Sequence, residues 1–100
     1  MALIECRIGP RPRHVQASII TLAGEHDVAT IDADNEVLTA AIASCDSDVV
    51  LDVSGVTFMS AGTVDLIIRA RQVLARQSRS LTLQAPSRSA KRVLDLCGVT

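Results

Sequence analysis

Aromatic residues are almost absent from this sequence, which has one Phe, no Tyr and no Trp. A core must therefore be built from Val, Ile, Leu and Ala, of which the β-branched residues pack well in strands. With 100 residues, 48% of them hydrophobic, the chain is large enough to bury one continuous core. We expect a single α/β domain over residues 1–100.

The sequence also lacks an excess of one charge and a long apolar run. Ten Lys and Arg residues balance eleven Asp and Glu residues, so that the net charge is -1 and no overall field points to nucleic acid. No apolar run approaches the roughly 20 residues of a membrane span, and the N-terminus lacks the order of a signal peptide. We expect a cytoplasmic protein that binds neither nucleic acid nor a membrane directly.

Motifs of catalysis, metal binding and redox chemistry are missing as well. Cys6, Cys45 and Cys97 are widely spaced and form no C-x-x-C pair, which predicts small buried hydrophobic side chains with no redox role. There is no Gly-rich phosphate loop with Lys, no G-x-S-x-G sequence and no dinucleotide fingerprint. We therefore expect no catalytic residue, no metal site and no cofactor, and hence no enzyme.

The hydrophobic pattern predicts alternating strands and helices. Strands are expected at residues 3–8, 16–23, 49–59 and 81–83, with a break near residues 54–55, and helices at residues 31–44, from about 61–63 onward, and 87–98. In the first helix Asp34 extends the apolar stripe, and Thr30 or Asp32 can cap the start. Because the later helices act as crossovers, the four-stranded sheet should be mixed, with three or more helices mainly on one face.

The stretch from residue 49 to 68, VVLDVSGVTFMSAGTVDLII, organises the rest of the chain. Its apolar beginning suits a central strand, and its small residues suit a loop that turns into a helix. Ser60 is a good N-cap for that helix. A helix start exposes backbone N–H groups with partial positive charge, so recognition is expected there.

This stretch resembles the core of the STAS domain, the fold of bacterial anti-sigma-factor antagonists. The residues that carry the resemblance are the run LDVSGVTFM at 51–59, and the closing segment from Ser87 to Gly98 is also similar to that of the family. The resemblance implies a regulator of transcription in the stress response. Such a protein binds a kinase-like anti-sigma factor, frees a sigma factor, and is released when the partner phosphorylates a Ser at the helix start.

The match becomes imperfect at the position of that Ser. Counted without a gap, Ala61 occupies the phosphoacceptor position and Ser60 the acidic position before it. A one-residue deletion would instead align Ser60 with the acceptor, but it would rotate the following helix by roughly 100°. We favour the ungapped alignment, on which the family's phosphoacceptor is lost.

The resemblance implies a partner-binding switch loop and a possible second contact. The loop comprises Met59, Ser60, Ala61, Gly62, Thr63 and Asp65, with Ser60 and Thr63 as candidate phosphoacceptors, and the second contact comprises Glu25, His26 and Asp27. Family members typically carry Gly-Glu-Leu-Asp here, so His26 is a departure. The alternatives are a module that senses a small ligand or nucleotide at the helix start, and a scaffold or oligomerisation domain. The expected state is a monomer or weak homodimer.

Overall fold

The computed structural model describes residues 2–10, 16–44 and 47–98. Its elements follow the order β1 (Ala2–Pro10), β2 (Gln16–His26), the 3-10 turn η1 (Val28–Thr30), α1 (Ile31–Ser44), β3 (Asp48–Met59), α2 (Ala61–Arg76), β4 (Leu81–Gln84) and α3 (Arg88–Leu96). The predicted order of strands and helices is confirmed. β1 continues to Pro10, beyond its expected end, since an edge strand tolerates proline.

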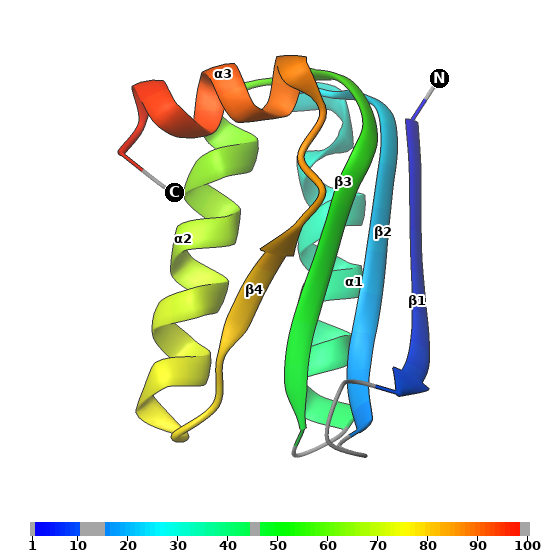
Figure 1. Cartoon of the computed structure of the whole chain (residues 1–100), viewed down its shortest axis with the longest axis vertical. Helices are drawn as coiled ribbons and strands as arrows, with labels where there is room; N and C mark the ends of the chain where they lie inside the picture. Colours follow the sequence, from blue (N-terminus) through cyan, green and yellow to red (C-terminus); the bar gives the residue numbers. More distant parts are fainter. Residues whose placement is uncertain (1, 11–15, 45–46, 99–100) are drawn as a thin grey trace.

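The sheet has the order β1-β2-β3-β4 in the described part of the chain. β1 and β2 form an antiparallel hairpin, while β2 with β3 and β3 with β4 are parallel, so the sheet is mixed as predicted. Figure 1 shows α1 and α2 side by side along the sheet, with α3 lying across the end where β3 passes into α2. The right-handed crossover rule places both crossover helices on the same face.

The hydrophobic core lies between the sheet and the helices. Val49, Leu51 and Val53 of β3 are fully buried, as a central strand requires. Burial of each such side chain contributes about 1.5–3 kcal/mol. The other strands and helices add further apolar side chains to the same cluster, among them Ile20, Leu22, Leu38, Ala41, Val64, Ile67, Leu74, Ala90 and Leu94.

β3 is a single strand of 12 residues, where the sequence predicted a break at Ser54 and Gly55. The irregularity falls in the pairing with β2, whose register shifts between Thr21 and Ala23. A Cβ on Gly55 would lie 3.1 Å from the Cβ of Ala23. The glycine therefore allows the two strands to approach closely through the shift, and the strand continues to Met59.

The start of α1 is capped earlier than predicted. Neither Thr30 nor Asp32 is the N-cap: Asp27 caps η1, which runs directly into α1. The Asp27 side chain accepts a hydrogen bond from the Ala29 amide, and the Thr30 hydroxyl accepts one from the Asp27 amide. The sequence pattern located the first full turn of α1 but not the tighter turn that precedes it.

The prediction of buried cysteines is wrong for two of the three. Cys6 and Cys97 are exposed, and Cys45 lies outside the described residues. Cys6 belongs to the edge strand β1, and Cys97 is the C-terminal cap of α3. Both residues lie on the apolar face of their element, but at positions that neighbouring elements do not cover. Sequence periodicity indicates the face of an element and not how far that face is covered.

Candidate functional site

The candidate site forms where β3 ends and α2 begins. Ser60 has extended backbone angles (φ -80°, ψ 161°), and its hydroxyl accepts a hydrogen bond from the Thr63 amide at 3.3 Å. This is the geometry of an N-cap, and it confirms the capping role predicted for Ser60. The cap fixes the direction in which the first turn of α2 leaves the sheet.

Hydrogen bonds to the end of β2 hold this loop from the inside. The carbonyl of His26 accepts from the Ser60 amide at 2.9 Å and from the Thr63 hydroxyl at 3.2 Å. The hydroxyls of Ser60 and Thr63 are 3.1 Å apart, so that Ser60 can donate to Thr63. The loop is therefore anchored to β2 by hydrogen bonds as well as being continuous with β3.

The predicted loop residues divide into a buried and an outward-facing group. Met59 and Thr63 are 1% exposed and belong to the interior. Ala61, Gly62 and Asp65 are exposed and Ser60 is half-buried, so these side chains form the outer surface of the loop. The structure thus brings the six residues together, although only part of the set is accessible to another molecule.

Gly62 lies close to the start of α1. A Cβ built on Gly62 would lie 2.9 Å from Cδ1 of Ile31, the first residue of α1, so the end of that flexible side chain would have to shift. The switch loop and the start of α1 therefore form one continuous surface.

The residues of the possible second contact have separate roles. Glu25 is exposed and Asp27 caps η1, whereas the His26 side chain is fully buried. His26 Nε2 lies 2.9 Å from the carbonyl oxygen of Ala23 and 3.1 Å from that of Leu3. Because carbonyl oxygens only accept, Nε2 carries a hydrogen and donates it to them.

The partner of the other ring nitrogen is Asp34 of α1. Its Oδ2 lies 2.9 Å from His26 Nδ1 and accepts a hydrogen bond from the Thr30 hydroxyl at 3.1 Å. Asp34 is 2% exposed, and its Oδ1 has no hydrogen-bond partner among the described residues. The predicted grouping of His26 with its sequence neighbours missed this pair, and a carboxylate within an apolar helical stripe was the signal that could have revealed it.

Two exposed apolar side chains adjoin the loop and were not singled out in the sequence. Phe58 is 51% exposed and precedes Met59, which pairs with His26 in the sheet; Val28, two residues beyond His26, is 81% exposed. β4 pairs only with residues 49–52 of β3, so it does not reach Phe58. Phe58, just before the loop, and Val28, just after the end of β2 that anchors it, therefore leave apolar side chains exposed, a feature typical of interaction sites.

The described residues contain no group of three or more His, Cys, Asp or Glu side chains that could hold a metal ion. Nor is any helix within residues 2–10, 16–44 and 47–98 both long and apolar enough to span a membrane. The imidazole of His26 has no solvent-exposed surface.

Comparison with known proteins agrees with this fold. The sequence matches the STAS domain family over residues 10–100. The chain belongs to the STAS domain family. The resemblance seen in the sequence is thereby confirmed, and so is the predicted mixed sheet with three helices. A search of curated proteins found no match.

Solved structures of STAS proteins share the architecture. An anti-sigma factor antagonist from Mycobacterium paratuberculosis has a TM-score of 0.76 at 20% identity, covering 96% of this chain and 79% of its own. The anti-sigma factor antagonist SpoIIAA in its unphosphorylated form has a TM-score of 0.67 at 18% identity, covering 92% and 83%. The STAS domain of an antagonist from Rhodobacter sphaeroides has a TM-score of 0.58 at 15% identity, covering 83% and 87%. At these identities the likeness shows the fold.

Proposed function

We propose that this chain is a non-enzymatic regulator that binds a kinase-like anti-sigma factor through the switch loop, and that it escapes the usual release by phosphorylation. The observation that carries the proposal is the outward-facing Ala61 in the first turn of α2, at the family's phosphoacceptor position on the ungapped alignment. The similarity to anti-sigma-factor antagonists supports the kind of partner. Such a role places the protein in the bacterial cytoplasm, in the control of transcription under stress.

The two remaining hydroxyls of the loop differ in accessibility. Thr63 is 1% exposed and its hydroxyl donates to the His26 carbonyl, so phosphorylation there requires the first turn of α2 to open. Ser60 is half-buried, and its oxygen accepts the capping hydrogen bond. Ser60 is therefore the more accessible of the two but is engaged as the N-cap of α2, and Ala61 offers no hydroxyl.

The surroundings of Ala61 suit a protein partner. Phe58 and Val28 supply exposed apolar area next to the loop, and aromatic side chains are common anchors in protein interfaces. Because the N-cap and the buried Thr63 fix the loop, binding requires little ordering of this segment. A charge added at residue 61 would fall in the interface and not in the core.

Capture of the kinase-like anti-sigma factors of the host by the immobilised protein tests the proposal. We expect wild-type protein to bind one of them and, with ATP and Mg²⁺, to stay bound without a mass increase. Ala61→Ser restores a hydroxyl at this position. The variant should gain about one phosphate and then dissociate from the partner, because the phosphate adds about -1.5 to -2 charge at the interface. Ser60→Asp and Ala61→Asp should abolish capture, whereas Ala40→Asp on the exposed face of α1 is the matched control.

Each outcome separates the parts of the proposal. Undiminished capture by both aspartate variants of the loop contradicts the interface. A phosphate mapped to Ser60 of the wild-type protein, followed by release, contradicts the escape from phosphorylation but retains the partner. Failure to capture any kinase-like anti-sigma factor contradicts the partner and favours the sensing or scaffold alternatives.

A further inference from the structure

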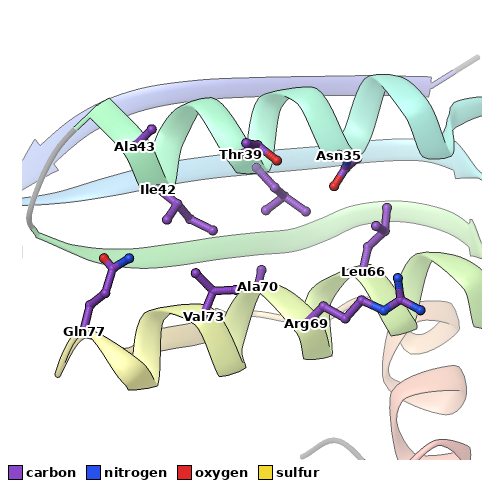
Figure 2. A pocket seen from close by; sticks show the side chains of 10 residues that line it. Asn35, Thr39, Ile42, Ala43, Leu66, Arg69, Ala70, Val73 and Gln77 are labelled. Carbon is purple, nitrogen blue, oxygen red and sulfur yellow. The ribbon is translucent and has the colours of Figure 1, made fainter.

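A cavity of about 350 Å³ lies between α1 and α2 (Figure 2), and none of residues 59–63 lines it. Its lining comes from residues 35–43 of α1 and residues 66–77 of α2, and we call it the α1–α2 groove. At a rise of about 1.5 Å per residue, these segments run for about 12 Å and about 16 Å. The groove is thus a long site, and its volume lies in the range of small-molecule pockets.

The interior of the groove is apolar. Leu38 and Ala70 are buried at its base, and Figure 2 shows Ile42, Leu66 and Val73 pointing into the space between the two helices. Val73 is 38% exposed, although it belongs to a helix that packs against the core on its other side. An apolar chain laid along the groove would remove this surface from water.

One charged side chain, Arg69, lines the groove within the described residues. Its Nη2 donates to Oδ2 of Asp65 at 2.9 Å, in an ion pair whose side chains are 71% and 55% exposed. A guanidinium has five N–H donors, so this exposed pair leaves others to an anion at the mouth of the groove. The lining therefore combines an apolar channel with a single positive group.

We propose that the α1–α2 groove binds a single-chain amphiphile with an anionic head, namely a free medium-chain fatty acid. The alkyl chain lies between the helices along Leu66, Ala70 and Val73, and the carboxylate meets the guanidinium of Arg69. This site is distinct from the partner surface at Ala61 and does not depend on the proposed function. The shape and apolar lining select a chain, and the N–H donors of Arg69 that Asp65 leaves unused select a carboxylate, which accepts, over an ammonium head, which only donates.

Titration of the ¹⁵N-labelled protein with decanoate, followed by amide shifts, tests the proposal. Decanoate, with a short alkyl chain and one charged group, should bind with a Kd on the order of 1 mM. We expect the largest shifts within residues 35–43 and 66–77 and at Asp65, the partner of Arg69, and little change at residues 59–63 of the switch loop. Decylamine, with the same chain and the opposite charge, should bind more weakly.

Variants of α2 provide matched controls. Arg69→Gln should weaken decanoate binding by about two- to fivefold, the worth of an exposed ion pair, whereas Arg71→Gln, an exposed arginine outside the lining, should leave it unchanged. Val73→Glu adds a negative charge to the wall and should weaken decanoate binding by more than tenfold. The amide spectrum of each variant without ligand shows whether it is folded.

Three results would overturn the proposal. The first is a spectrum in which decanoate moves no amides of the lining. The second is equal binding of decanoate and decylamine, or equal effects of Arg69→Gln and Arg71→Gln, because either removes the role of the charge. The third is concentration-dependent dimerisation that Val73→Glu abolishes, because the groove would then bind a second copy of this chain.

Discussion

The buried pair of His26 and Asp34 allows a sharp test of what holds the switch loop in place. In the structure Nε2 of His26 is committed to two carbonyl oxygens, so Nδ1 is the atom that meets Asp34. One shared proton lies between Nδ1 and Oδ2, because a carboxylate and an unprotonated nitrogen would both be acceptors. An amide at residue 34 supplies that hydrogen by itself.

The expected effects of Asp34→Asn and Asp34→Ala differ for this reason. The Asn Nδ2 can donate one hydrogen to His26 Nδ1 and the other to the Thr30 hydroxyl, which keeps the Asp27 carbonyl as its own acceptor. Asp34→Asn should therefore cost less than about 1 kcal/mol of unfolding free energy. Asp34→Ala leaves His26 Nδ1 buried without a partner. Breaking a buried pair in this way should lower the free energy of unfolding by about 3 kcal/mol.

His26→Leu completes the test, since Leu is the residue that STAS proteins typically carry there. Alone, it leaves the Asp34 carboxylate buried without the imidazole and should cost about 2–4 kcal/mol. The double variant with Asp34→Ala removes both polar groups. Its loss of unfolding free energy should therefore be smaller than the sum of the two single losses by at least about 2 kcal/mol. A domain of this size has about 5–15 kcal/mol of stability, so the single variants should stay folded in water.

Urea unfolding followed by far-ultraviolet circular dichroism measures these differences, because the chain has no Trp or Tyr for fluorescence. The slope of the unfolding free energy against urea concentration should be the same for all variants if only the folded state changes. Equal losses for Asp34→Asn and Asp34→Ala would refute the shared-proton geometry. Additivity of His26→Leu and Asp34→Ala within about 0.5 kcal/mol would refute the coupling of the two side chains.

Two further effects on stability follow from the hydrogen bonds. Ser60→Ala removes the N-cap of α2 and should lower the free energy of unfolding in urea by about 1 kcal/mol. Asp can still cap a helix, so Ser60→Asp should keep most of the stability of the wild type even though it no longer captures the partner. The Arg79 side chain donates to the carbonyls of Ser47 and Ile42 at 2.8 and 2.9 Å, so Arg79→Ala should cost about 2–3 kcal/mol by the same assay. Arg79→Lys should recover less than half, since one ammonium does not reproduce the fork; full recovery would contradict this.

Local signals in the sequence were sufficient for most of the fold. The bounds of α1 are those predicted, Ser60 caps α2 as expected, and Ser87, at the start of the predicted last helix, is the N-cap of α3. These features depend on neighbouring residues: an apolar period, a short hydroxyl side chain before it, and a glycine, Gly98, in a left-handed conformation after it. Such signals are readable without knowledge of the tertiary structure.

The details of the candidate site required the tertiary structure. The pairing of His26 with Asp34 and the approach of Gly62 to Ile31 join separate elements, so the helical spacing that places Asp34 on the apolar stripe does not identify its partner. The exposure of Phe58 depends on where β4 stops pairing with β3. The α1–α2 groove likewise depends on the distance between two helices, which periodicity does not define.

The switch loop separates the residues that shape it from the residue that would meet a partner. Ser60 caps α2, and Thr63 and the His26 carbonyl anchor its first turn from inside, whereas Ala61 is exposed and has no side-chain hydrogen-bonding group. A change at residue 61 can therefore alter recognition or phosphorylation at little cost in stability. By contrast, a change at Thr63 would disturb the hydrogen bonds that hold the loop. On the ungapped alignment that the proposed function adopts, this division lets an Ala occupy the family's acceptor position without disturbing the hydrogen bonds that shape the loop.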